Sequence, residues 1–153
     1  MMRVTIIYAG RLERLLAYLI DVFILLVSTI LIAATFNGSA TAVIITFFCC
    51  LVTYYTYFTS STWQATPGKR LMNIYVARTD HKSLNQSDAL ERFLALILPI
   101  LPLFTSFIPE NVTPLLVFWL TIFWFAPILF TNERIGYHDR LCKTRVLVGK
   151  VGR

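Results

Sequence analysis

Four charged residues carry most of the chemistry that this sequence offers: Arg14, Asp21, Arg92 and Asp139. Asp21 is the only acidic or basic residue between positions 15 and 36. That run is long enough to cross the hydrocarbon core of a bilayer, which is about 30 Å thick. A carboxylate at that depth costs roughly 2.5–3.5 kcal/mol on insertion scales. It therefore needs either cationic partners or a role in ion binding.

The first hypothesis is structural. Arg14 and Arg92 stand at the mouths of apolar segments, and long arginine side chains can reach inward from such positions. We predict an interhelical cluster of Arg14, Asp21 and Arg92, with Asp139 closing it from the C-terminal tail. Such a cluster would fix the register of the helices. The protein would then be a structural or accessory membrane protein that acts through partners.

The alternative is transport. An intramembrane carboxylate beside hydroxyl side chains can bind and release Na⁺, K⁺ or H⁺. The hydroxyls nearest to this description are Ser28, Thr35, Thr46 and Thr53. Asp21 would then be the ion site of a small cation/proton antiporter. A chain with few short spans would need a homo-oligomer for that task, and no internal repeat is visible in the sequence.

Enzymes, metal proteins and cofactor-dependent proteins receive no support. His138 and Asp139 resemble half of a catalytic dyad, but no nucleophile accompanies them at a recognisable spacing. Two histidines and three cysteines show no metal-ligand spacing. We expect no catalytic residue, no metal and no cofactor.

The charge distribution argues against nucleic acid as a partner. The net charge is +6, yet all 14 lysines and arginines lie in residues 3–14, 69–92 and 134–153. The connections at residues 37–39 and 109–113 carry no lysine or arginine. This is the positive-inside pattern of four crossings with both termini in the cytoplasm. The partner indicated is a lipid bilayer, and the expected location is a bacterial inner membrane.

Composition supports the same class, because 57% of the residues are apolar and only 14% are charged. We expect one all-α membrane domain over residues 1–153, a bundle of four transmembrane helices. The predicted spans are about 15–36, 40–58, 93–108 and 115–130. A cytoplasmic loop at 59–92 and a cytoplasmic tail at 131–153 complete it.

The third and fourth runs are short, and Pro99, Pro102 and Pro127 predict kinks in them. They either cross fully or form a re-entrant pair. Residues 71–77 are rich in Ile, Tyr and Val, and residues 144–148 also look like a strand, so each is expected to be one. Paired, they would form a small two-stranded element on the cytoplasmic side.

These motifs together resemble the RDD family of small membrane proteins, which is named for one arginine and two aspartates. The resemblance covers Arg14 to Asp21, residues 66–71 and 74–76, residues 88–92, and residues 136–139 with 144–146. It implies that Asp139 is the second aspartate. Asn73 stands where the family commonly has glycine. Few family members are characterised; some are associated with cation/proton exchange, so the resemblance permits that activity and does not specify it.

Overall fold

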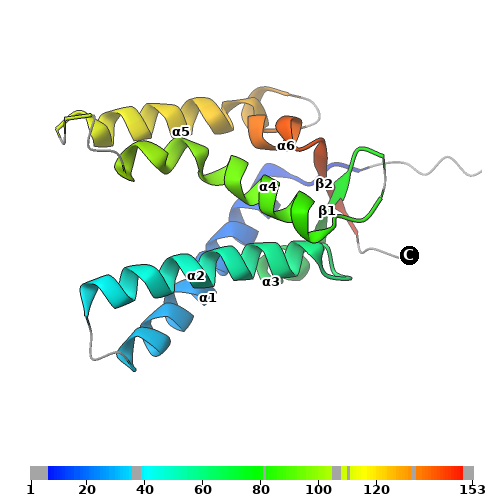
Figure 1. The fold of residues 1–153 in the computed structure, drawn as a ribbon. Coiled ribbons are helices and arrows are strands. Elements are labelled where there is room, and N and C mark those ends of the chain that lie inside the picture. The colour runs from blue at the N-terminus through cyan, green and yellow to red at the C-terminus, as the bar shows by residue number, and fades with distance from the viewer. Residues whose placement is uncertain are drawn as a thin grey trace, which may run out of the picture.

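The computed structural model describes residues 7–35, 39–80, 82–104, 108–109, 111–131 and 134–149. The described chain is mostly helical, with one small sheet (Figure 1). Its elements follow the order α1 (Arg11–Ala34), α2 (Ala40–Ser60), α3 (Pro67–Leu71), β1 (Ile74–Arg78), α4 (Gln86–Ile97), the 3₁₀ helix η1 (Leu98–Phe104), α5 (Thr113–Phe130), α6 (Tyr137–Leu141) and β2 (Thr144–Val148).

Three helices, α1, α2 and α5, are long and apolar enough to cross a membrane. They have 24, 21 and 18 residues, and most of their large apolar side chains face outward, as a lipid environment requires. The third predicted run, 93–108, is not one α-helix: α4 ends at Ile97, and η1 continues to Phe104. A fourth crossing and kinks at the prolines therefore stay predictions.

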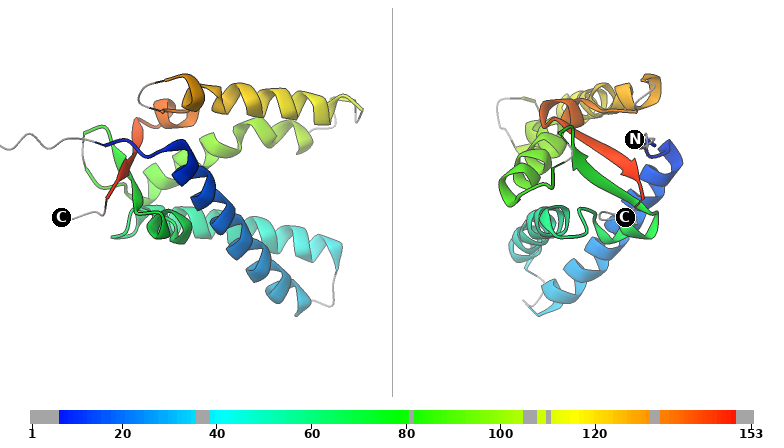
Figure 2. Two further views of the ribbon diagram at one scale, coloured as in Figure 1. Left: turned by 180° about the vertical axis from the view of Figure 1, so that it is seen from behind. Right: turned by 90° about the vertical axis from the view of Figure 1, so that its right-hand side faces the viewer.

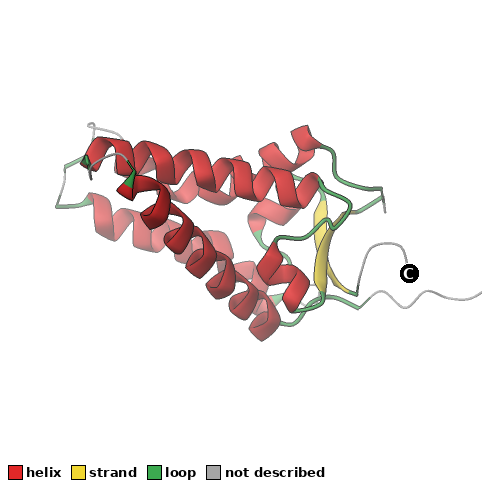
Figure 3. Ribbon diagram, turned by 90° about the horizontal axis from the view of Figure 1, so that it is seen from below, coloured by secondary structure: helices red, strands yellow, loops and turns green. Residues whose placement is uncertain are grey.

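The short elements gather at one end of the long helices, where the sheet lies (Figure 3). Strands β1 and β2 pair antiparallel, with Val76 opposite Val146. This confirms the predicted two-stranded element, although β1 begins at Ile74 because Leu71 ends α3. In Figure 2 the two strands lie side by side with helices around them.

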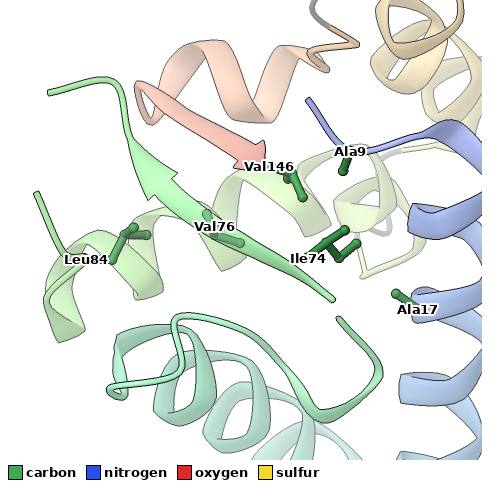
Figure 4. Close-up of a cluster of buried hydrophobic side chains, with 6 residues drawn as sticks. All are labelled: Ala9, Ala17, Ile74, Val76, Leu84 and Val146. Carbon is green, nitrogen blue, oxygen red and sulfur yellow. The ribbon is translucent and has the colours of Figure 1, made fainter. Parts of the chain in front are cut away.

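An isolated pair of strands is marginally stable in water, so packing must support this one. Its support is an apolar cluster of six buried side chains (Figure 4). They come from the N-terminal arm, α1, both strands and the segment before α4, and they are Ala9, Ala17, Ile74, Val76, Leu84 and Val146. A second cluster of Leu25, Tyr55 and Phe93 joins α1, α2 and α4.

A helix–strand unit occurs twice in the chain, 70 residues apart. The first copy is α3 with β1, and the second is α6 with β2. The residue before each strand has a positive φ, +55° at Asn73 and +50° at Lys143. Two residues before each helix cap the backbone is again left-handed, +48° at Gln64 and +54° at Arg134. Glycine suits such a backbone best and asparagine tolerates it, so Asn73 fits its position.

The hydrogen bonds of the two units match as well. The amide of Arg70 donates to Thr66 O at 2.8 Å, and that of Arg140 donates to Gly136 O at 3.1 Å. The long helices before the units also end 70 residues apart, at Ser60 and Phe130. The expectation that the chain has no internal repeat is thus corrected. Over 66–78 and 136–148 only three of thirteen positions are identical, so the repeat is hidden in the sequence.

The chain segments before α1 and before α4 also contact the two strands in corresponding ways. On β2, Ala9 N donates directly to Val146 O at 3.1 Å. On β1, the side-chain amide of Gln64 lies between the strand and the segment before α4. It donates to Val76 O at 3.1 Å and accepts from Leu84 N at 2.8 Å. The segment before α1 therefore covers the edge of β2 directly. The edge of β1 is covered by Gln64, whose side chain links it to the segment before α4.

Candidate functional site

Asp21 is fully enclosed where α1, α2 and α3 meet, with 1% of the residue exposed. Its Oδ1 accepts hydrogen bonds from Tyr54 Oη at 2.7 Å and from the amide of Gly68 at 2.8 Å. Its Oδ2 accepts from Thr66 Oγ1 at 2.5 Å. Three donors without net charge thus hold this carboxylate, and they come from two other elements.

The sequence Thr66-Pro67-Gly68 explains why α3 points its start at Asp21. Thr66 is the N-cap, but its hydroxyl makes no bond within its own helix because it donates to Asp21. Pro67 has no N–H, so the amide of Gly68 is the first one that needs a partner. Asp21 supplies that partner from α1 and also suits the positive end of the helix.

Gly68 is required by the close approach of α1. A Cβ at this position would lie 2.2 Å from Ala17 O and 2.7 Å from Asp21 Oδ1. Ala17 and Asp21 are one helical turn apart on α1, and both are buried. A small residue on each side therefore brings the α3 amide within hydrogen-bonding distance of the carboxylate.

Asp139, on α6, is also completely buried, yet it is surrounded by cations. Arg92 Nη2 donates to its Oδ1 at 2.5 Å, and Arg14 Nη1 approaches its Oδ2 at 3.4 Å. Thr144 Oγ1 donates to Oδ1 at 3.3 Å and accepts from Arg92 Nε at 3.1 Å. Burial alone would raise the pKa of Asp139, but Arg92, His138 and Arg14 hold that pKa below its usual range.

Two further bases lie next to these carboxylates. Burial lowers the pKa of His138 to about 4, with Arg92 and Lys69 adding to the effect and Asp139 opposing it, so the imidazole is neutral near pH 7. Burial, helped by Arg92, also lowers the pKa of Lys69 to about 7, against the attraction of Asp21 and Asp139. Lys69 is half-buried, and its ammonium group makes no hydrogen bond within the described residues.

The structure brings together three of the four predicted site residues, Arg14, Arg92 and Asp139. The expectation that Asp21 lies among the arginines is wrong: no guanidinium is among its hydrogen-bond or ion-pair partners in the described part of the chain. Arg14 lies two helical turns before Asp21, about 10 Å along the axis, and its side chain turns to Asp139 instead.

Several residues of the site were missed from the sequence. Tyr54, Thr66 and Gly68 are uncharged, so the pattern of charges did not single them out. Pro67 after Thr66 was a usable signal, because this pair marks the start of a helix whose amides need an acceptor. Thr144 and Lys69 gave no comparable signal. No group of three or more metal-ligating side chains occurs among the described residues.

Apolar helices of membrane-spanning length, joined at one end to a small sheet and two buried carboxylates, define a small integral membrane protein. The RDD family profile matches residues 8–143, which is most of the chain. The chain therefore belongs to the RDD family. No curated protein and no solved structure matches it.

Proposed function

We propose that the chain is a structural or accessory membrane protein in which two buried carboxylates lock helical hairpins onto a shared base. The observation that carries this proposal is that Asp139 binds residues from two helices that are far from it in the sequence. Its carboxylate joins Arg14 of α1 to Arg92 of α4, and these residues lie 125 and 47 positions away in the chain. Removing one partner of such a buried ionic group is strongly destabilising, which suits a role in fixing the register of the helices.

The surroundings of Asp21 support the same role. Its Oδ1 already accepts two hydrogen bonds and its Oδ2 accepts a short one. Two of the four hydroxyls considered for ion binding donate within their own helix: Ser28 donates to Ile24 O and Thr35 to Ile32 O. A transported cation would have to displace the start of α3 to reach the carboxylate.

In the proposed topology, α4 with η1 and then α5 form a second hairpin, to give a bundle of four crossings with proline-bent third and fourth helices. The sheet, α3, α6 and both termini lie in the cytoplasm of a bacterial inner membrane. The basic residues of this end support that orientation. A reporter fused to the C-terminus, active only in the cytoplasm, tests it; an inactive reporter in a folded, membrane-inserted protein would contradict it.

The alternative is a small oligomeric cation/proton antiporter that uses Asp21. It is favoured by a carboxylate that is buried in an apolar helix and is held by neutral donors instead of a guanidinium. Proteoliposomes with a pH-sensitive dye inside decide between the two. Proton movement on adding Na⁺ or K⁺ that is lost in Asp21→Asn would support the antiporter and contradict the structural proposal.

The structural proposal expects no such movement and no enzymatic activity. It expects instead that the wild-type protein captures a membrane-protein partner when it is isolated in mild detergent. The matched variant is Asp139→Asn, because it should lose both thermal stability and that partner. A variant that melts like the wild type would contradict the structural role of the carboxylate.

A further inference from the structure

The polar interior at the base of the helices holds more positive charge than its own carboxylates balance. Arg14, Lys69 and Arg92 are its cations, and Asp21 and Asp139 its anions. His138 is neutral near pH 7. The two arginines balance the two carboxylates. A proton on Lys69, whose pKa is about 7, therefore adds a positive charge that has no anion of its own, in a partly buried place where an unbalanced charge is costly.

The hydrogen-bond donors of Arg14 in this interior are also only partly satisfied. Arg14 Nε is buried and has no hydrogen-bond partner among the described residues. The two bonds that its guanidinium does make, to Asp139 Oδ2 and to Val146 O, are both long at 3.4 Å. Normal charge-assisted bonds of this kind are about 2.7–2.9 Å. Arg14 is therefore held in place without being satisfied.

The repeated helix–strand unit shows why Lys69 is left over. Lys69 and Asp139 occupy matching positions, 70 residues apart, on the two short helices α3 and α6. Asp139 has two guanidiniums as partners. Lys69 follows Gly68, whose amide binds Asp21, yet its own ammonium group bonds to nothing in the described chain. One unit thus presents an acid that is bonded to two guanidiniums, and the other presents a base that hydrogen-bonds to neither of the carboxylates near it.

We propose that Lys69, with Arg14, binds a phosphate-type oxyanion at this base, going beyond the structural role. A tetrahedral oxyanion offers acceptors to a guanidinium and an ammonium at once, and it supplies the missing negative charge. Lys69 is half-buried, so the site has an open side. The phosphate comes either from a lipid headgroup of the adjoining leaflet or from solution, because both present the same oxygens.

The test measures thermal unfolding of the full-length protein in mild detergent at constant ionic strength. One arm adds inorganic phosphate, a second adds phosphatidylglycerol, and a third adds phosphatidylcholine. A rise in Tm with inorganic phosphate shows a free anion. A rise with phosphatidylglycerol alone shows a lipid headgroup. No rise with either probe, or an equal rise with phosphatidylcholine, overturns the proposal.

The variant Lys69→Gln should weaken binding of the effective probe by about tenfold, the loss expected for one charge-assisted contact. The matched control is Lys82→Gln, which removes an exposed lysine outside the base and should bind like the wild type. If Lys69→Gln proves too unstable to measure, Lys69→Arg is the variant to use; it keeps the charge and should retain binding. Equal binding by Lys69→Gln and the wild type, or equal weakening in Lys82→Gln, would refute the assignment.

Discussion

Asp21 and Asp139 are two equally buried carboxylates that this protein treats in opposite ways. Asp21 is held by a phenol, a threonine hydroxyl and a backbone amide. Asp139 is held by two guanidiniums with help from Thr144. Neutral donors fix the position of a carboxylate and leave its charge in place, whereas guanidiniums also neutralise it. Asp21 therefore anchors α3, and Asp139 balances cations brought in by α1 and α4.

The repeated unit makes this contrast clearer. In the first copy the short helix offers an amide, at Gly68, and the carboxylate comes from α1. In the second copy the short helix carries the carboxylate itself, and the long helices bring the cations. The same local backbone is thus joined to its long helices through opposite chemistry.

Asp139→Asn should cost about 3–5 kcal/mol of unfolding free energy, because it leaves Arg14 and Arg92 as uncompensated buried cations. Denaturant unfolding in mild detergent measures the change. The control is Asp80→Asn, since Asp80 pairs with Arg78 at the surface and its loss should change little. Similar small effects for both variants would mean that the cluster around Asp139 is not structural.

Gly68→Ala should cost about 3 kcal/mol, since the new Cβ would meet the backbone oxygen of Ala17 at 2.2 Å and cannot be relieved by a side-chain rotation. Gly10→Ala is the control, because its Cβ would meet only the movable carboxylate of Glu13 at 3.2 Å. Thermal melting of the two variants compares them. Equal melting temperatures would show that α1 and α3 can separate freely.

Asp21→Asn should cost about 2 kcal/mol, less than the loss at Asp139, because no guanidinium loses an ion-pair partner and one hydroxyl loses its acceptor. Adding Thr66→Val removes that hydroxyl, so the double variant should lose less than the sum of the two single variants. A double-mutant cycle of unfolding free energies measures the coupling. Strict additivity would show that Thr66 and Asp21 do not interact.

Acidification should weaken the Asp139 side of the site through His138. Its pKa is lowered from 6.5 to about 4 in the folded protein, so the unfolded chain binds the proton more readily between these values. Stability is then fully present above pH 6.5 and falls as the pH drops towards 4. Between pH 7 and 5.5 the loss should be about 1 kcal/mol.

The measurement is the pH dependence of the melting temperature, with His138→Phe as the comparison. The variant has no proton to bind at this position, so its curve should be flatter over the same range. A wild-type slope that is unchanged in His138→Phe would assign the pH dependence to other groups.

The sequence predicted the class and most of the elements for reasons that are local. Apolar runs predict α1, α2 and α5, and the two segments rich in strand-forming side chains predict the two strands of the sheet. The third run was predicted less well, because the two prolines favour a 3₁₀ helix after Ile97, a local change that hydropathy does not detect.

The site was predicted only in part. Arg14, Arg92 and Asp139 meet as the charge pattern indicated, because buried opposite charges must find one another. The placement of Asp21 failed, because a carboxylate can be satisfied equally by neutral donors, and the sequence does not say which donors will be near. The repeat was hidden because backbone conformation, not side-chain identity, is what its two copies share.

The sequence is enough to assign this chain to the membrane proteins and to the RDD family. Its lysines and arginines are confined to three segments, and its first long helix contains a carboxylate. Only the tertiary structure decided which partner each carboxylate has. Hydropathy and charge act over a whole segment and can be recognised along the chain. A hydrogen bond depends on tenths of an ångström between residues as distant as 14 and 139, and only the packing of the helices sets that distance.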